Sequence, residues 1–217
     1  MREHAPDVDG EPPLVTDGGR PAGDIERAAA AVARGDPVVY PTETVYGLGA
    51  DATDADAVES VFELKRRERD EPLSLGVPSV DAAFAHARPS PLAERFMRAF
   101  LPGPVTVVVE RREGLPDALT AGRDRVGIRV PDHDVALAFL DAAERPVTAT
   151  SANVSGRPSV TDPADLDDAI REGVAAVLDG GTTGGTGSTV VDPERNVIHR
   201  RGAMAGAVEA WLDEQSG

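Results

Sequence analysis

The sequence lacks cysteine altogether, contains one lysine, and has few aromatic residues, which make up 4% of its 217 positions. Without cysteine, neither disulfides nor a zinc site built on thiolates can hold the fold together, and a reducing compartment is expected. No apolar run approaches the about 20 residues needed to cross a bilayer. The first residues, MREHAPDVDGEPP, also lack the apolar core of a signal peptide. We therefore expect a cytoplasmic protein with no membrane association.

Positive charge is scarce, because 22 Lys and Arg face 38 Asp and Glu, which gives a formal net charge of −16. Such a surface repels phosphate backbones, so tRNA binding is expected to be weak or indirect. The acid excess, the abundance of alanine and glycine and the near-absence of lysine suit a salt-rich, halophilic cytoplasm, where the Debye length is about 3 Å at 1 M salt. A GC-rich genome, whose codons favour arginine over lysine, is the alternative explanation.

The order of predicted elements indicates one α/β domain. Residues 1–22 are rich in Pro, Gly and Asp without periodicity, which predicts a disordered or loosely attached tail before a folded domain over 23–217. Helix-like and strand-like patterns then interleave. Helices are predicted at 25–35, 53–67, 90–103, 133–143, 163–173 and 205–215, and strands at 37–42, 72–77, 104–110, 126–130, 146–150, 174–181, 188–192 and 196–200. The last two strands are too close for a crossover helix, so we expect a mixed sheet flanked by helices.

The single lysine, Lys65, lies near the end of the helix predicted over 53–67. It follows Val58, Val61 and Phe62 at helical spacing, in line with the apolar face. Three arginines within 66–69 make this the densest positive segment, which favours an anion site. The alternative is a solvated helix end whose cations complement the helix dipole and pair with nearby glutamates. Retention of one compact ammonium among many guanidinium groups favours the anion site.

Two further segments carry small polar side chains into glycine-containing loops. TATSANVSGRPSVTDP, residues 148–163, places Thr150, Ser151 and Asn153 after a strand, an arrangement that presents neutral donors to a phosphate or a base. The alternative is an Asx or Ser/Thr turn that bonds only its own backbone. LDGGTTGGTGSTVVDP, residues 178–193, lacks the lysine and the following helix of a phosphate-binding P-loop, which leaves a flexible substrate cover or merely a flexible connection.

A fourth segment, YPTETVYGLGADAT over residues 40–53, ends a strand with Thr42 and Thr44. Tyr46 lies nearby, and the glycines at 47 and 49 allow another backbone or a ligand to approach closely. The alternative is a strand that leaves the sheet through a glycine turn.

Seven segments together resemble one family. PTETVYGLGADAT, LKRR followed by EPL, LPGPVTVVV, VGIRVPDH, TSANVSGRPS, GSTVVD and IHRRGAM occur in the order and approximate spacing of the Sua5/YrdC/YciO family, the L-threonylcarbamoyladenylate synthases. The resemblance covers residues 24–212, and the chain looks like the short YrdC-like form. It implies an α/β fold with a twisted mixed sheet around a concave, positively lined cavity.

The resemblance also implies a reaction. L-threonine, bicarbonate and ATP, which enters with Mg²⁺, would give threonylcarbamoyl-AMP and pyrophosphate for t6A modification of tRNA. That makes the chain a nucleotidyltransferase whose product passes to a downstream threonylcarbamoyl transferase complex. Two alternatives stay open. One is a YciO-like relative that binds RNA or a nucleotide without synthase activity. The other is a carbamoyl-transferring domain like that of hydrogenase maturation factors.

By the same resemblance, family motifs transfer to residues of this chain. The Lys-x-Arg pair becomes Lys65 and Arg67, assigned to catalysis. ATP binding is assigned to Arg67, Ser151, Asn153, Thr161 and Arg200, threonine binding to Thr42, Thr44, Arg129 and Ser188, and no residue to a metal. Glu68, Glu71 and Gly76 depart from the family pattern, and Glu71 is expected to pair with Arg67 or Arg69. Catalysis would rest on positioning and charge stabilisation, with the flexible ammonium of Lys65 following the reacting group.

Overall fold

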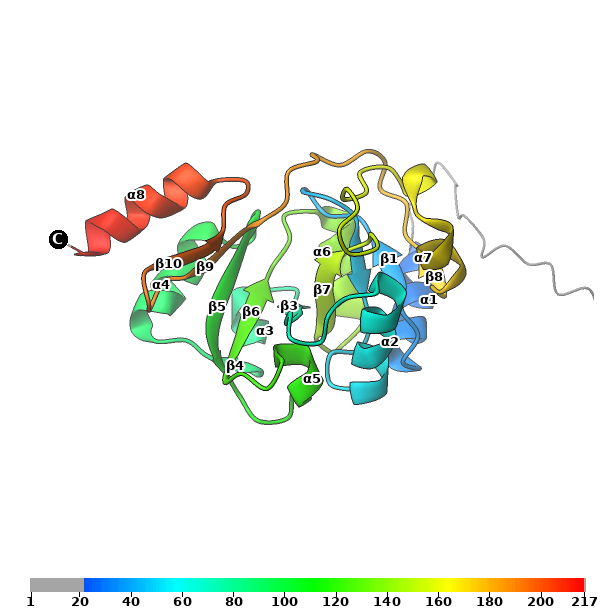
Figure 1. Ribbon diagram of the computed structural model, residues 1–217, viewed down its shortest axis with the longest axis horizontal. Coiled ribbons are helices and arrows are strands. Elements are labelled where there is room, and N and C mark those ends of the chain that lie inside the picture. Colours follow the sequence, from blue (N-terminus) through cyan, green and yellow to red (C-terminus); the bar gives the residue numbers. More distant parts are fainter. Residues whose placement is uncertain (1–21, 217) are drawn as a thin grey trace, which may run out of the picture.

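One mixed β-sheet organises the protein (Figure 1). The structure, a computed structural model, describes residues 22–216. The tail predicted over residues 1–22 therefore lies outside the described residues, except for Ala22, where the first helix begins, three residues before its predicted start at residue 25. In the part of the chain that is described, no helix is both long and apolar enough to cross a membrane.

The sheet contains ten strands in the order β10-β9-β5-β6-β3-β7-β2-β1-β8, with β4 paired to β5 outside this path. The strands are β1 Val38–Tyr40, β2 Gly47–Gly49, β3 Ser74–Gly76, β4 Ala87–Arg88, β5 Val105–Arg111, β6 Arg125–Arg129, β7 Val147–Ser151, β8 Ala176–Val177, β9 Thr189–Asp192 and β10 Val197–Arg200. The pairs β1–β8, β3–β6 and β5–β9 are parallel, and the other pairs are antiparallel. The expected mixed sheet is confirmed.

Helices pack around this sheet. They are α1 Ala22–Ala33, α2 Ala55–Lys65, α3 Val80–Ala83, α4 Pro91–Phe100, α5 Asp117–Thr120, α6 Asp134–Ala142, α7 Asp168–Glu172 and α8 Ala205–Ser216, with a 3₁₀ turn, η1, at Pro163–Asp165. Asp54 caps α2 by accepting hydrogen bonds from the backbone N–H groups of Asp56 and Ala57.

Two predicted helices end differently from expectation. The helix predicted over 163–173 is split into η1 and α7, because Leu166 adopts an extended conformation that buries its side chain in the core. The helix predicted to reach Arg67 stops at Lys65, since Arg66 takes a left-handed conformation with φ 50° and ψ 42°. This turn separates Arg67 from the helix axis and directs the chain toward the sheet.

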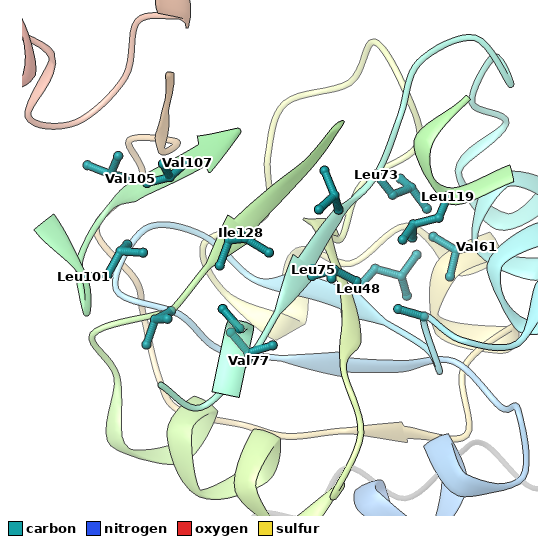
Figure 2. Close-up of a cluster of buried hydrophobic side chains, with 14 of the residues drawn as sticks. Leu48, Val61, Leu73, Leu75, Val77, Leu101, Val105, Val107, Leu119 and Ile128 are labelled. Atoms are coloured by element: carbon teal, nitrogen blue, oxygen red, sulfur yellow. The ribbon is translucent and has the colours of Figure 1, made fainter. Parts of the chain in front are cut away.

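Apolar side chains from the sheet and from flanking helices form the main core (Figure 2). Leu48, Leu75 and Ile128 project from the strands, while Val61 of α2 and Leu119 of α5 meet them from the helices. Full burial of one such side chain stabilises the fold by about 1.5–3 kcal/mol. A second cluster joins α1, α6 and β1. The core thus anchors the strands whose other side chains form the site described next.

Candidate active site

A cavity of about 740 Å³ lies on one face of the sheet. Its floor is made by alternate residues of several strands, as expected for side chains that share one face. They are Ser74, Thr106, Val108, Arg125, Gly127, Arg129, Ala149, Ser151 and Val190. Gly127 and Ala149 lie on either side of Ser74 in neighbouring strands. A Cβ atom at Gly127 would lie 2.5 Å from Ser74 Oγ, so a glycine at this position leaves room for the Ser74 side chain on the cavity floor.

Three of the six arginines that line the cavity reach it from well-separated parts of the chain. Arg67 follows α2, Arg129 ends β6 and Arg200 ends β10, and all three line the cavity. Burial lowers the pKa of Arg200, and the positive charges of Arg67 and Arg129 lower it further. These groups therefore repel one another, and an anion placed among them would relieve that repulsion. The cavity is a local concentration of positive charge in a chain whose net charge is −16.

The three arginines differ in how they are paired. Arg67 Nη1 lies 3.4 Å from Glu71 Oε2, which confirms the predicted ion pair at this departure from the family pattern. Arg129 Nη2 lies 2.8 Å from Glu43 Oε2, so its guanidinium group faces a carboxylate of the protein. Within residues 22–216, no carboxylate lies within ion-pair distance of Arg200. Its guanidinium group donates at 3.0 Å to both Ser188 Oγ and the Ser188 carbonyl.

Lys65 does not line the cavity. Its side chain is buried, with 1% of the residue exposed, and the ammonium donates to the carbonyl oxygens of Ser151 and, at 2.8 Å, Asn153. Burial and the charge of Arg67 lower the pKa of Lys65 to about 8, and Glu71 opposes them in part. This placement does not match the expected flexible ammonium that follows a reacting group. Lys65 instead holds the Ser151–Asn153 segment from behind the cavity wall.

The two residues of the Ser-x-Asn motif, Ser151 and Asn153, lie in different surroundings. Ser151 lines the cavity, but Asn153 is buried in its own loop and does not. Asn153 Nδ2 donates to the carbonyls of Val154 and Arg157, both at 2.9 Å. These two acceptors fix the orientation of the amide and leave Oδ1, an acceptor, without a partner. Asn153 therefore fits the alternative considered from the sequence, a turn that bonds only its own backbone, because its amide donor is bonded to its own loop and is not available to a phosphate.

The residues predicted to bind threonine lie at the cavity, whereas Thr161 does not. Thr42, Thr44, Arg129 and Ser188 all line it. Thr42 Oγ1 lies 2.8 Å from Thr44 Oγ1 and donates to the Val45 carbonyl at 2.6 Å, so the two hydroxyl groups are held together. The Thr161 carbonyl accepts a hydrogen bond from Thr183 N at 2.9 Å and ties two loops together.

Several residues of the site were not assigned from the sequence. Glu43 holds Arg129, Thr106 Oγ1 lies 3.0 Å from Ser188 Oγ, and Arg123 and Arg125 line the outer part of the cavity. Arg125 is neutralised there by Asp192 and Glu194, at 2.7 and 2.8 Å. The alternation of β5 and β6 was a usable signal for Thr106 and Arg125, because it places them on the same face as the predicted Arg129.

Known proteins resemble this chain in sequence. The Sua5_yciO_yrdC family model, described as "Telomere recombination", matches residues 30–202. A threonylcarbamoyl-AMP synthase from Pyrococcus abyssi is 41% identical over 170 residues, which cover 77% of this chain and 50% of that protein. The chain therefore spans about half the length of this relative.

Two solved structures share the fold. The P. abyssi Sua5 structure complexed with L-threonine has a TM-score of 0.76 and 39% identity, covering 82% of this chain and 54% of that one. The E. coli YciO structure also has a TM-score of 0.76, with 26% identity, covering 82% of this chain and 89% of that one. The fold is thus equally similar to both structures, while the sequence is more similar to Sua5.

Proposed function

Since the chain belongs to the Sua5/YciO/YrdC family, we propose that it is a threonylcarbamoyl-AMP synthase, a nucleotidyltransferase that acts on L-threonine, bicarbonate and ATP. The observation that carries this proposal is the meeting of Arg67, Arg129 and Arg200 in one cavity of a strongly acidic protein. A triphosphate and a carboxylate-bearing amino acid are both anionic, and such a cavity attracts them. The identity to the P. abyssi synthase supports the same assignment.

The proposed reaction has two steps. The threonine amine attacks bicarbonate, water leaves, and a carbamate forms. A carbamate oxygen then attacks the α-phosphorus of ATP, the bond to the β-phosphate oxygen breaks, and pyrophosphate leaves. Two unit charges about 4 Å apart repel by about 4 kcal/mol at an effective dielectric constant of about 20, so cations must stand beside the two anions as they approach. The protein would act by position and charge without a covalent intermediate.

The residues assigned from the sequence have the following roles in this proposal. Arg200 and Arg67 hold phosphate oxygens, and the Ser151 hydroxyl group donates to the same ligand. Thr42, Thr44, Arg129 and Ser188 form the threonine end. Lys65 and Asn153 position the Ser151 segment from behind, because Lys65 binds both carbonyls of that segment and Asn153 closes its loop. Lys65 is thus a positioning residue rather than a group that touches the reactants.

Magnesium, in this proposal, arrives with the nucleotide. Within residues 22–216, no group of three or more His, Cys, Asp or Glu side chains is arranged to hold a metal ion. Asp192 and Glu194, the carboxylates beside Arg125, are both paired with its guanidinium group. The residues present therefore do not fit a resident metal, and Mg²⁺ would be held by the ATP phosphates, its preferred partners. Its contribution there is to neutralise phosphate charge.

The deciding experiment measures pyrophosphate released from ATP by the purified chain. We expect release that requires both L-threonine and bicarbonate, with threonylcarbamoyl-AMP as the second product. Release that is independent of threonine would contradict the proposal. No release, together with nucleotide binding by calorimetry, would favour the YciO-like alternative. Carbamoyl phosphate replacing both threonine and bicarbonate would indicate a carbamoyl-transferring domain.

The setting of the reaction is part of the same proposal. We infer a cytoplasmic enzyme, adapted to high salt, that passes its product to a transferase which modifies tRNA. The net charge of −16 disfavours a strong direct complex with tRNA. Titration of tRNA at two salt concentrations tests this: tight binding that weakens steeply with salt would show a direct nucleic-acid interface.

A further inference from the structure

The glycine-rich segment between β8 and β9 crosses the top of the molecule in Figure 1 and is tied to the cavity wall. Gly185 N donates to the Thr44 carbonyl at 2.6 Å, and Thr183 N donates to the Thr161 carbonyl at 2.9 Å. A Cβ atom at Gly184 would lie 2.8 Å from the Glu43 carbonyl oxygen. The segment over residues 180–187 therefore lies directly against the wall that carries Thr42 and Thr44, and it leads into Gly187 and Ser188, which line the cavity.

One side chain joins these loops. Tyr46 is fully buried, and its hydroxyl donates to the Gly181 carbonyl at 2.7 Å while accepting from Gly180 N at 3.0 Å. Its backbone N–H donates to the Val160 carbonyl at 2.9 Å. Tyr46 thus connects the Thr42–Thr44 wall, the loop around residue 160 and the start of the glycine-rich segment. The Asp179 side chain also takes part in this junction, because its Oδ1 accepts from Gly181 N at 2.8 Å and lies 3.4 Å from the Tyr46 hydroxyl.

The segment itself has few means of holding this position. Five of its eight residues are glycines with no side chain to pack, and Gly181 adopts φ +75°. Glycine loses more backbone entropy on ordering than any other residue, so the few hydrogen bonds that fix such a segment count strongly. Burial, as the largest cause, raises the pKa of Tyr46 to about 12, so the hydroxyl stays protonated as a donor at neutral pH.

We propose that Tyr46 is a positioning residue that fixes segment 180–187 against the Thr42–Thr44 wall and thereby completes the amino-acid end of the cavity. The inference rests on the proposed function for the identity of the amino acid, L-threonine. It goes beyond that function in assigning Tyr46 and the glycine-rich segment. Tyr46 lines the cavity, and its hydroxyl is bonded to Gly180 and Gly181 of the segment. In this proposal the segment acts as a fixed wall, which differs from the flexible substrate cover considered from the sequence.

Hydrogen exchange of the Tyr46→Phe variant tests the positioning independently of activity. Loss of the hydroxyl removes two of the bonds that hold Gly180 and Gly181, so backbone exchange over 180–187 should rise by about three- to tenfold, as for one lost hydrogen bond. Tyr40→Phe is the matched control, because its buried hydroxyl makes one long bond of 3.5 Å, to the Thr148 carbonyl, and none to this segment. Equal exchange over 180–187 in both variants would overturn the assignment of Tyr46.

Kinetics test the link to the amino acid. In Tyr46→Phe the KM for threonine should rise by about three- to tenfold while the KM for ATP and kcat change less than twofold. A parallel rise of both KM values would indicate general loosening of the site and would overturn the inference. If the parent releases no pyrophosphate, the proposed function fails, while the exchange experiment still decides whether Tyr46 fixes the segment.

A second variant keeps the proposal falsifiable if Tyr46→Phe is poorly stable. Gly181→Ala adds no steric contact, since nothing lies within 4 Å of the new Cβ, and perturbs only the backbone turn that the hydroxyl holds. Both substitutions act on one junction, so the effect of the double variant on the KM for threonine should be clearly smaller than the product of the single effects. Gly114→Ala is the control, because its φ of +100° and open surroundings give similar strain elsewhere. Independent, multiplicative effects of Tyr46→Phe and Gly181→Ala would overturn the proposal.

Discussion

Lys65 Nζ donates to the Asn153 carbonyl at 2.8 Å, across 88 residues of sequence, and so joins the two motifs on which the family resemblance depends most. The same ammonium donates to the Ser151 carbonyl, and the Lys65 carbonyl in turn accepts from Ser155 N at 2.8 Å. One buried side chain therefore couples the end of α2 to the loop after β7. This relationship explains why a chain with arginine at nearly every other basic position has one lysine here. The larger, planar guanidinium group of an arginine would not fit the buried space in which one ammonium donates to two neighbouring carbonyl oxygens.

Replacement of Lys65 by methionine should destabilise the protein by about 1–3 kcal/mol, because two buried carbonyl groups lose their donor. We expect the midpoint of urea unfolding to fall with an unchanged slope. Arg69→Met is the matched control on the same segment: Arg69 is exposed and pairs with Glu59, so its loss should change stability by less than about 0.5 kcal/mol. If Lys65→Met kept the parental stability but lost activity, the result would instead indicate that Lys65 contacts the reactants directly.

The pKa of Lys65 predicts how stability depends on pH. It is lowered to about 8 in the folded protein from an ordinary value near 10.5. Between these values the unfolded state binds more protons than the folded state, so this group makes stability rise with pH in that window. The slope contributed is at most about 1.4 kcal/mol per pH unit. Unfolding free energies measured across the window from about pH 8 to about pH 10.5 should therefore rise more steeply for the parent than for Lys65→Met. Parallel curves would exclude the lowered pKa.

Local patterns predicted most of the fold, and the failures share one cause. The capping Asp54, the β-branched run of β5 and the helix before Phe100 follow from local preferences, which the structure satisfies. The split after Asp165 and the left-handed Arg66 do not, since both are turns that tertiary packing selects. Short elements such as α3, α5 and β4 carry too few residues for a periodic signal.

The site was predictable as a set of motifs but not as a geometry. Strand alternation fixes which face Arg129 shares with Gly127 and Arg125, so part of the floor was available from the sequence. The sequence did not show which of the neighbouring cations, Lys65 or Arg67, faces the cavity. Arg67 and Lys65 are two residues apart, yet the left-handed Arg66 between them sends one into the cavity and the other behind its wall. The partner of Arg129, Glu43, lies 86 residues away and only the fold brings it close.

The Glu43–Arg129 pair should be energetically coupled. Both side chains are largely buried, at 19% and 7% exposure, and their charged atoms are 2.8 Å apart. A double-mutant cycle with Glu43→Gln and Arg129→Gln should give a coupling energy above about 1 kcal/mol, because either single change leaves a buried charge without its partner. Arg88 and Glu110, an exposed cross-strand pair 3.9 Å apart, should couple by less than about 0.5 kcal/mol. Equal coupling in the two cycles would show that burial adds nothing at Glu43.

Salt distinguishes the two explanations of the composition. If the net charge of −16 reflects adaptation to a salt-rich cytoplasm, screening should stabilise the fold against its own repulsion. The thermal midpoint should then rise with potassium chloride, with most of the rise below about 1 M, where the Debye length has already fallen to about 3 Å. A continuing linear rise would indicate salt exclusion from the surface instead. A midpoint indifferent to salt would leave codon usage as the explanation.

Arg200 and Arg201 offer the sharpest test of the cavity, because two adjacent arginines differ in what they face. Arg200 lines the cavity without a carboxylate partner in residues 22–216, whereas Arg201 does not line it and is paired with Glu209. A hydrogen bond to a charged group is worth about 1.5–3 kcal/mol, so Arg200→Gln should raise the KM for ATP by roughly 10- to 100-fold. Its stability should change little, since relief of the repulsion from Arg67 and Arg129 offsets the lost bonds to Ser188. Arg201→Gln removes the same charge from the molecule and should leave the KM for ATP within twofold of the parent (about 0.4 kcal/mol). If both variants weaken ATP equally, net charge alone attracts the nucleotide, and the cavity loses its assigned anchor.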